Sequence, residues 1–272
     1  MANADTTFSG SVPQIYTRYM GPIFFEPFAE DMARRIAATP GRDILETACG
    51  TGIVTRALCR ALPDETFITA TDLNQPMIDY AKATSGGERV DWRQADAQNL
   101  PFEDATFDVA VTAFGVMFFP DKVGAFREVL RVLRPGGQWI FNVWNRLETV
   151  DLQFIAHTAV AALYPNDPPG FFRRTPCGYH DVTAIRADLT QAGFVDVEIE
   201  TLDLVSRASS PRDAAIGLIR GTPISSEIAA RDPMGLDAAV DAATRAIEAR
   251  YGDARVEARM QAHVATARRR PE

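Results

Sequence analysis

A glycine-rich turn between an apolar run and an amphipathic segment constrains this chain more than any other feature. The apolar run Ile44-Leu45 ends at Glu46, and the turn Gly50-Thr51-Gly52 follows shortly after it. Apolar residues then recur with helical spacing from Ile53, so the predicted order is strand, glycine loop and helix. Glycine is needed where the backbone takes φ > 0 or passes close to a ligand. The free N–H groups at the start of the next helix attract polar ligand atoms, so we expect a nucleotide-binding loop.

Length and charge exclude several classes of protein. At 272 residues the chain can bury a sizeable core. Its net charge of −8 argues against a nucleic-acid partner, because binding a polyanion requires a basic surface. No apolar run approaches the about 18 residues that a membrane-spanning helix needs, and the polar N-terminus has no signal-peptide pattern. We expect a soluble, cytoplasmic protein with a small-molecule partner; the sequence leaves open whether it is a monomer or a homodimer.

The cysteines and histidines do not suggest a metal centre. The chain has three widely spaced cysteines and three histidines that do not lie at zinc-ligand spacing from them: Cys49, Cys59, Cys177, His157, His180 and His263. We therefore expect reduced thiols and no bound metal.

Strands and helices alternate through residues 40–145, which we interpret as the cofactor-binding core. After the first strand, further strands are predicted at 66–71, 90–95, 107–114 and 138–144, and helices at 53–62, 76–84 and 121–134. The run at 107–114 is almost continuously apolar, which is typical of a strand covered by helices on both faces. Such alternation predicts an α/β fold with a doubly wound, mostly parallel sheet.

The pattern changes after Thr149. Helices are predicted at 152–163, 181–192 and within 209–253, and strands at 195–205 and 256–267. The segments 149–178 and 209–253 hold too few apolar residues to fold alone, so we interpret them as helical lid insertions in one domain spanning 1–272. Residues 13–39 are rich in aromatic side chains and are predicted to form an N-terminal helical cap, helical from Glu26.

Two classes of cofactor fit a Gly-x-Gly turn followed by an acid about 20 residues later. In both, Asp72 would accept hydrogen bonds from ribose hydroxyls. The dinucleotide fingerprint places a small residue where this chain has Thr55, and Glu46 would repel a pyrophosphate. S-adenosylmethionine carries an ammonium group and no phosphate, so the acidic lining favours it. A nicotinamide-dependent oxidoreductase and a non-catalytic S-adenosylmethionine-binding protein are the alternatives.

Four short motifs follow one another along the chain in the order that is typical of one protein family. Glu46-Thr47-Ala48-Cys49-Gly50-Thr51-Gly52 resembles the first motif of class I S-adenosylmethionine-dependent methyltransferases, and Thr71-Asp72-Leu73-Asn74 resembles the second. Residues 95–102 with Phe107-Asp108 resemble the third and fourth, and residues 133–137 resemble the turn before the fifth strand. The similarity is greatest to the ubiquinone/menaquinone-biosynthesis type of small-molecule methyltransferase. It implies a Rossmann-like sheet of seven strands whose last strand, at 256–267, is antiparallel.

The resemblance also implies a role for each matching residue. One group would surround the methionine portion of the cofactor: Glu46, Ala48, Gly50 and Gly52. A second group would hold the ribose and the adenine: Asp72, Leu73, Met77, Asp96, Ala97 and Gln98. Phe114 would lie near the ammonium group and the transferred methyl, and Tyr16 or Tyr19 would close over the cofactor from the N-terminal cap.

The acceptor is less constrained than the cofactor. His180 and His157 are the candidate bases, because histidine exchanges protons near neutral pH, although either could be purely structural. Arg173 and Arg174 could bind an acidic acceptor, but a solvated loop is the ordinary explanation for such a pair. Apolar side chains in the insertions favour a lipophilic or aromatic acceptor, methylated on oxygen, carbon or nitrogen.

Overall fold

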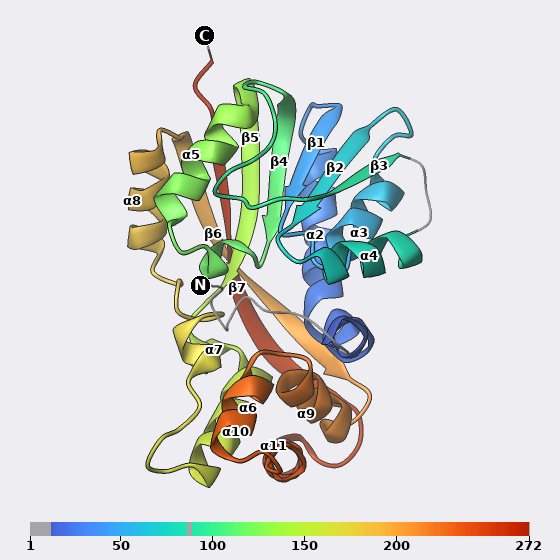
Figure 1. Ribbon diagram of the computed structural model, residues 1–272, viewed down its shortest axis with the longest axis vertical. Coiled ribbons are helices and arrows are strands. Elements are labelled where there is room, and N and C mark those ends of the chain that lie inside the picture. The colour runs from blue at the N-terminus through green and yellow to red at the C-terminus, as the bar shows by residue number, and fades with distance from the viewer. Residues whose placement is uncertain (1–11, 86–88, 272) are drawn as a thin grey trace. The chain divides into compact units, whose positions relative to one another are not determined.

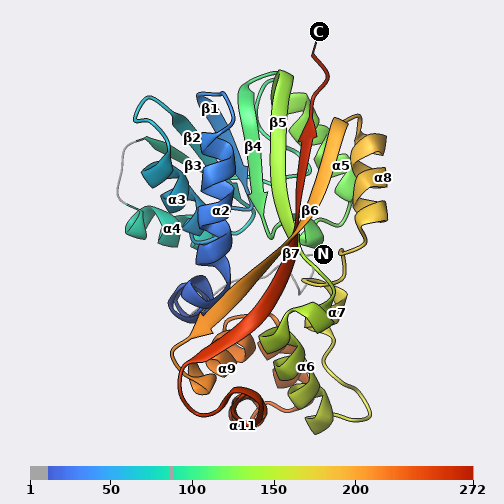
Figure 2. The same cartoon turned by 180° about the vertical axis from the view of Figure 1, so that it is seen from behind.

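A seven-stranded sheet organises the computed structural model, which describes residues 12–85 and 89–271 (Figures 1 and 2). The strand order is β3-β2-β1-β4-β5-β7-β6. The pairs formed by β1 with β2, β1 with β4, β2 with β3, and β4 with β5 are parallel, and β7 is antiparallel. The strand bounds are β1 Asp43–Thr47, β2 Phe67–Asp72, β3 Val90–Gln94, β4 Phe107–Ala113, β5 Leu133–Trp144, β6 Val195–Ala208 and β7 Val256–Arg268. The predicted doubly wound sheet with an antiparallel last strand is confirmed.

The helices also follow the predicted order. The first part of the chain forms α1 Val12–Ile15, η2 Tyr16–Phe25, α2 Glu26–Ala37, α3 Ile53–Ala61, α4 Gln75–Thr84, η3 Val116–Phe118 and α5 Lys122–Val132. The remainder forms η4 Leu147–Thr149, α6 Asp151–Leu163, α7 Phe171–Arg174, α8 Val182–Ala192, α9 Pro211–Arg220, α10 Ile224–Arg231 and α11 Leu236–Tyr251. None of these described helices is both long enough and apolar enough to cross a membrane.

The chain divides into two compact units. The core unit holds Phe28–Val143, Tyr179–Leu202 and the described part of Ala262–Glu272. The helical unit holds Trp144–Gly178, Asp203–Gln261 and the described part of Met1–Pro27. The long strands β6 and β7 contribute residues to both units, so the second half of the sequence cannot be cut into two consecutive domains.

The centre of the core unit is an apolar layer beneath the sheet. The helices α2 and α5 cover opposite faces of the sheet (Figures 1 and 2), which explains why β4 is an almost uninterrupted apolar strand. Fully buried side chains from α2, α3 and the central strands form one cluster that includes Met32, Ile36, Leu58, Val109 and Ile140. Each such side chain contributes about 1.5–3 kcal/mol on burial, and this rigid layer supports the loops at the carboxyl edge of the sheet.

One predicted boundary was wrong. The residues Pro135-Gly136-Gly137 were expected to separate a helix from a strand starting at Gln138, but β5 already begins at Leu133. The backbone of Gly136 donates to the Arg269 carbonyl oxygen at 3.1 Å, and the Arg269 N–H donates to the Gly137 carbonyl oxygen at 2.8 Å. Pairing with a strand end that lies far away in the sequence therefore extends β5 through a sequence that locally favours a turn.

Candidate functional site

The loop from β1 to α3 has an unusual backbone. Ala48, Gly50 and Gly52 all have positive φ, at 53°, 55° and 77°. For Ala48 this conformation costs roughly 1–2 kcal/mol, so the surrounding contacts must hold the loop in place. The N–H of Cys49 donates to the carbonyl oxygen of Thr71 at the end of β2, at 2.9 Å. The sequence-predicted nucleotide loop is thus a strained turn fixed to the neighbouring strand, and strained backbone is often found at functional sites.

Asp72 joins this loop to the end of β2. The N–H of Gly50 donates to Asp72 Oδ2 at 2.9 Å, and the N–H of Asn74 donates to Oδ1 at 2.8 Å. The side chain is buried, and burial raises the pKa of Asp72, while the bonds from Asn74 and Gly50 act in the opposite direction. A carboxylate oxygen has two acceptor positions, so Oδ2 retains one for a ligand hydroxyl in addition to its bond from the loop.

Glu46 is the second buried acid at this edge of the sheet. Only 1% of the residue is exposed, and Thr55 Oγ1 donates to its Oε2 at 2.6 Å. Burial raises the pKa of Glu46 to about 8, against the opposing effects of the Thr55 hydrogen bond and the charge of Arg56. Glu46 is therefore mostly neutral at pH 7 in this structure, and a cation bound beside it would favour its ionised form.

The end of β4 approaches the same loop. Phe114 has φ of 50°, its N–H donates to Asn142 Oδ1 at 2.9 Å, and its ring meets that of Phe28 edge to face at 5.1 Å. A Cβ on Gly115 would lie 2.5 Å from the Cβ of Ala48, so only glycine fits there. Gly115 and Asn142 were not identified as site residues from the sequence. The position of Gly115, shortly after an apolar strand, was the feature that could have indicated it.

Two further segments bring the predicted adenine-binding residues to the same edge. Leu73 follows β2 and is 49% exposed, whereas Met77 on α4 is buried. After β3, Asp96 Oδ1 accepts from the N–H of Gln98 at 2.9 Å, and Ala97 between them is buried. Because these segments follow the carboxyl ends of parallel strands, they lie where open α/β sheets bind their ligands.

The predicted tyrosines belong to a different unit from the loop. Tyr16 and Tyr19 lie in η2 of the helical unit. The Tyr16 ring stacks on Phe25 with 4.9 Å between centroids, and the Arg18 guanidinium lies over the Tyr19 ring at 5.1 Å. The π-helical form of η2 had no sequence signal that we recognised. That either tyrosine closes over a cofactor stays a prediction.

The two candidate bases belong to different units. His157 on α6 belongs to the helical unit and is half-buried; burial and the charge of Arg173 lower its pKa. Its Nδ1 is buried without a hydrogen-bond partner among the described residues. His180 belongs to the core unit, directly before the residue that caps α8. Burial lowers the pKa of the neighbouring His263, with a smaller electrostatic effect from His180 in the same direction. Whether either histidine is catalytic stays a prediction.

Arg173 and Arg174, considered above as possible ligands of an acidic acceptor, form ion pairs with acidic side chains of the protein. Arg173 pairs with Glu148 at 2.7 Å, and Arg174 pairs with Glu227 at 2.5 Å. Both pairs lie within the helical unit. They account for these two charges without a ligand, as expected for partly exposed ion pairs.

The donors and acceptors of the loop fit S-adenosylmethionine. A pyrophosphate would meet the carboxyl groups of Glu46 and Asp72, whereas an ammonium group and a ribose diol are groups that these acids bind. Thr51 Oγ1 is a buried loop atom without a hydrogen-bond partner in the described part of the chain. No group of three potential metal ligands occurs among the described residues.

The two loop glycines give a prediction that separates folding from binding. A Cβ on Gly50 would meet no atom within 4 Å, whereas a Cβ on Gly52 would lie 2.9 Å from Trp92 Cη2. We expect Gly50→Ala to cost about 1 kcal/mol of unfolding free energy, from its positive φ alone, and Gly52→Ala about 2–4 kcal/mol. Because the open space at Gly50 is where a ligand would approach the loop, Gly50→Ala should still bind S-adenosylhomocysteine at least tenfold more weakly.

Urea unfolding and calorimetric titration measure these two effects. Wild-type affinity in Gly50→Ala would show that no ligand approaches this part of the loop.

Comparisons with known proteins agree with this site. Residues 45–141 match the family model described as a methyltransferase domain. A demethylmenaquinone methyltransferase from Lactobacillus johnsonii is 27% identical over 184 residues, which are 63% of this chain and 75% of that protein. Methyltransferase tpcH from Aspergillus fumigatus is 31% identical over 172 residues, 59% of this chain and 60% of that protein, so less than two thirds of this relative is covered.

The fold is also found among solved structures. Phosphoethanolamine N-methyltransferase 2 from Haemonchus contortus, determined in complex with S-adenosyl-L-methionine, aligns with a TM-score of 0.62. The alignment covers 100% of this chain and 61% of that one, at 16% sequence identity. At this identity the comparison supports the architecture.

Proposed function

Because the chain is a class I S-adenosylmethionine-dependent methyltransferase, we propose that it methylates a small lipophilic or aromatic acceptor. Two of the similar proteins are named for small molecules, demethylmenaquinone and phosphoethanolamine. The net charge of −8 disfavours a nucleic-acid acceptor. The lipophilic character is suggested by the mostly apolar sequence of α6, where Phe154 and Leu163 are 36% and 41% exposed and so remain available to an acceptor.

Not all the apolar side chains of the insertions are available to an acceptor. Phe171, Phe172, Leu218 and Ile219 are almost completely buried, so they stabilise the helical unit itself. We keep the interpretation of residues 149–178 and 209–253 as an acceptor-side lid, and of residues 13–39 as a cap, as part of this proposal. We also propose that the protein works in the cytoplasm.

The side chains at the carboxyl edge of the sheet would bind and orient the cofactor. Glu46 would hold the ammonium group, Asp72 the ribose diol, and the segment from Asp96 to Gln98 the adenine. When bound, S-adenosylmethionine supplies a methyl group already activated by its sulfonium. The protein therefore has mainly to align the acceptor and exclude water. If the acceptor must lose a proton, His157 is a suitable base, because its lowered pKa leaves it neutral at pH 7.

A titration followed by an acceptor panel tests this function. Wild-type protein should bind S-adenosylhomocysteine in the micromolar range and should not bind NADH; the opposite result would favour the oxidoreductase alternative. Transfer of a labelled methyl group should then occur to quinols, phenols or aromatic amines. Tight cofactor binding with no methylated product across a broad panel would support a non-catalytic binding protein instead.

A further inference from the structure

The segment between β3 and β4 is the least regular part of the proposed cofactor site. It begins after Gln94, ends before Phe107, and contains no helix or strand among its residues. Its internal bonds are short-range turns: the N–H groups of Gln98 and Asn99 donate to Asp96, the N–H of Phe102 donates to the carbonyl oxygen of Leu100, and Thr106 Oγ1 donates to that of Glu103. Such a segment holds one conformation only if neighbouring elements fix it.

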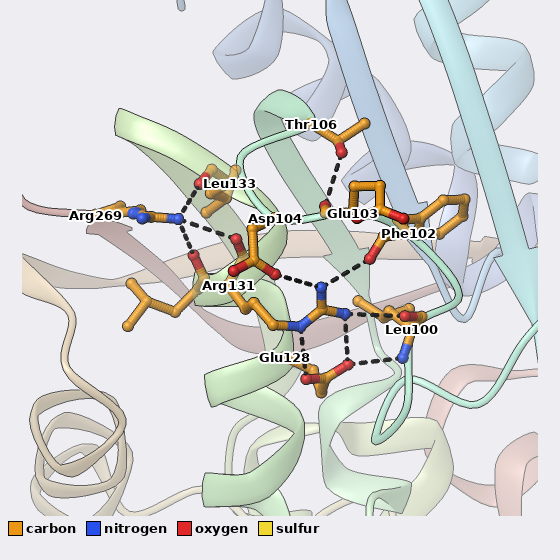
Figure 3. Close-up of polar contacts among 10 residues, drawn as sticks. Leu100, Phe102, Glu103, Asp104, Thr106, Glu128, Arg131, Leu133 and Arg269 are labelled. Atoms are coloured by element: carbon orange, nitrogen blue, oxygen red, sulfur yellow. Dashed lines mark hydrogen bonds and ion pairs between the residues drawn. The ribbon is translucent and has the colours of Figure 1, made fainter.

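The side chain of Arg131, in the last turn of α5, makes three hydrogen bonds to this segment (Figure 3). Its Nη2 donates to the carbonyl oxygen of Leu100 at 2.9 Å, and its Nη1 donates to that of Phe102 at 2.7 Å and to Asp104 Oδ1 at 2.8 Å. One planar guanidinium group therefore reaches three alternate residues of the segment, at positions 100, 102 and 104. Lysine cannot reproduce this pattern, because its compact ammonium group lacks the planar fork of separated N–H donors that reaches these acceptors together.

Glu128, one turn earlier on α5, completes the arrangement (Figure 3). Its carboxylate accepts from Arg131 Nε and Nη2, both at 2.9 Å, and its Oε2 also accepts from the N–H of Leu100 at 2.9 Å. Both backbone groups of Leu100 are thus bound to side chains of α5. The other end of the segment is tied to the same helix, since Gln98 Oε1 accepts from the N–H of Asp121, the α5 cap, at 3.0 Å.

The backbone around Arg131 is itself fixed by hydrogen bonds from Arg269. Arg269 Nη1 donates to the carbonyl oxygens of Leu130, Arg131 and Leu133, at 3.2, 2.9 and 2.6 Å. The Arg131 carbonyl oxygen also accepts from the N–H of Ala105 at 3.0 Å, so the junction between α5 and β5 is held from two sides. The C-terminal end of β7 therefore fixes the base from which the Arg131 side chain extends.

We propose that Arg131 is a positioning residue that, with Glu128, sets the conformation of Asp96–Gln98 and thereby the recognition of adenine by this methyltransferase. The inference rests on the proposed assignment of Asp96–Gln98 to the adenine. Leu100 lies two residues after Gln98, and α5 holds the chain on both sides of Asn99. Without the arginine side chain, the segment would keep its bonds through Gln98, its Leu100 N–H bond to Glu128 and the backbone bonds near its two ends. It would lose the three bonds that hold residues 100–104, and the direction of Asp96 would be less firmly fixed.

Arg134 offers a matched control. It lies three residues later at the start of β5 and also bridges two acids, Asp43 at 2.8 Å and Asp108 at 2.6 Å. Its side chain is 41% exposed, compared with 31% for Arg131. Asp43 opens β1, so this pair lies at the amino edge of the sheet, away from the proposed adenine segment.

Three variants of the full chain should be compared: Arg131→Lys, Arg134→Lys and the milder Glu128→Gln. Calorimetry should measure binding of S-adenosylhomocysteine and of its analogue with hypoxanthine in place of adenine, and thermal unfolding should measure Tm. We expect similar losses of Tm in the two lysine variants. Only Arg131→Lys should bind S-adenosylhomocysteine about tenfold or more weakly, and its preference for adenine over hypoxanthine should shrink. Glu128→Gln should show the same changes to a smaller degree.

Equal losses of affinity in Arg131→Lys and Arg134→Lys would overturn the proposal, because they would reflect general destabilisation. The proposal would also be overturned if Arg131→Lys or Glu128→Gln lost stability but kept the wild-type preference for adenine over hypoxanthine. Failure of the wild-type protein to bind S-adenosylhomocysteine at all would instead overturn the proposed function, and this inference with it.

Discussion

We expect Asp72→Ala to lower the affinity for S-adenosylhomocysteine by about a hundredfold or more while leaving the protein folded. Hydrogen bonds to a charged group contribute about 1.5–3 kcal/mol each, and two ribose hydroxyls would donate to this carboxylate. A loss of 1.4 kcal/mol corresponds to about a tenfold change in affinity. Removing the carboxylate also removes its bonds from Gly50 and Asn74, which we expect to cost about 1–3 kcal/mol of unfolding free energy.

Calorimetric titration and urea unfolding of the same preparation separate the two effects. Asp43→Ala is the matched control, because Asp43 is an acid at the amino edge of the sheet that pairs with Arg134 at 2.8 Å. This control should lose a little stability and no affinity. Unchanged affinity in a folded Asp72→Ala protein would refute the assignment of Asp72 to the ribose.

We expect the cofactor affinity to rise about tenfold per pH unit from pH 6 and to level off near the pKa of Glu46. That pKa is raised to about 8, chiefly by burial, so below it the carboxyl group must release a proton when a cationic ammonium group binds beside it. Release of one proton gives a slope of about one decade per pH unit. Titrations of S-adenosylhomocysteine in buffers of different ionisation enthalpy should detect this proton directly.

Glu46→Gln should bind more weakly and lose the pH dependence, because an amide does not titrate. Thr55→Val removes the hydroxyl that donates to Glu46 and should shift the levelling-off point to higher pH, since that bond favours the ionised form. A wild-type affinity independent of pH between 6 and 8 would contradict the role of Glu46.

The same group makes a stability prediction of defined sign. Folding raises the pKa of Glu46 from 4.5 to about 8, so between these values the folded, ligand-free protein binds more protons than the unfolded chain. Its contribution to stability is therefore fully lost above about pH 8 and progressively regained as the pH falls towards 4.5. Urea unfolding of wild type and Glu46→Gln across this interval should show a difference that grows with pH.

Much of the fold follows from local sequence. The strand and helix order from β1 to β4 was predictable because apolar periodicity and turn residues agree with one another there. Asp121 and Asp181 cap α5 and α8, as their positions before apolar helical stripes indicate. The early start of β5 at Leu133 was not predictable, because the Arg269 backbone that pairs with Gly136-Gly137 lies far away in the sequence.

The cofactor class could likewise be inferred from a few residues, because Glu46, the two loop glycines and Asp72 occur at fixed spacing. The sequence did not reveal how those residues are held: that Thr55 binds Glu46, that Asp72 binds the loop itself, or that Gly115 touches Ala48. Nor did it single out Arg131, which contacts backbone carbonyls about 30 positions earlier. Every residue has a backbone carbonyl, so such a contact leaves no recognisable pattern in the sequence.

The sequence by itself determined most of the strands and helices, the glycine loop and the acids at the strand ends, because each depends on neighbours within a few residues. Only the tertiary structure decided the ionisation of Glu46, the anchoring of the segment between β3 and β4, and the division into a core unit and a helical unit. Burial, hydrogen-bond geometry and contacts between distant strands set these properties, and none of them is a local property of the chain.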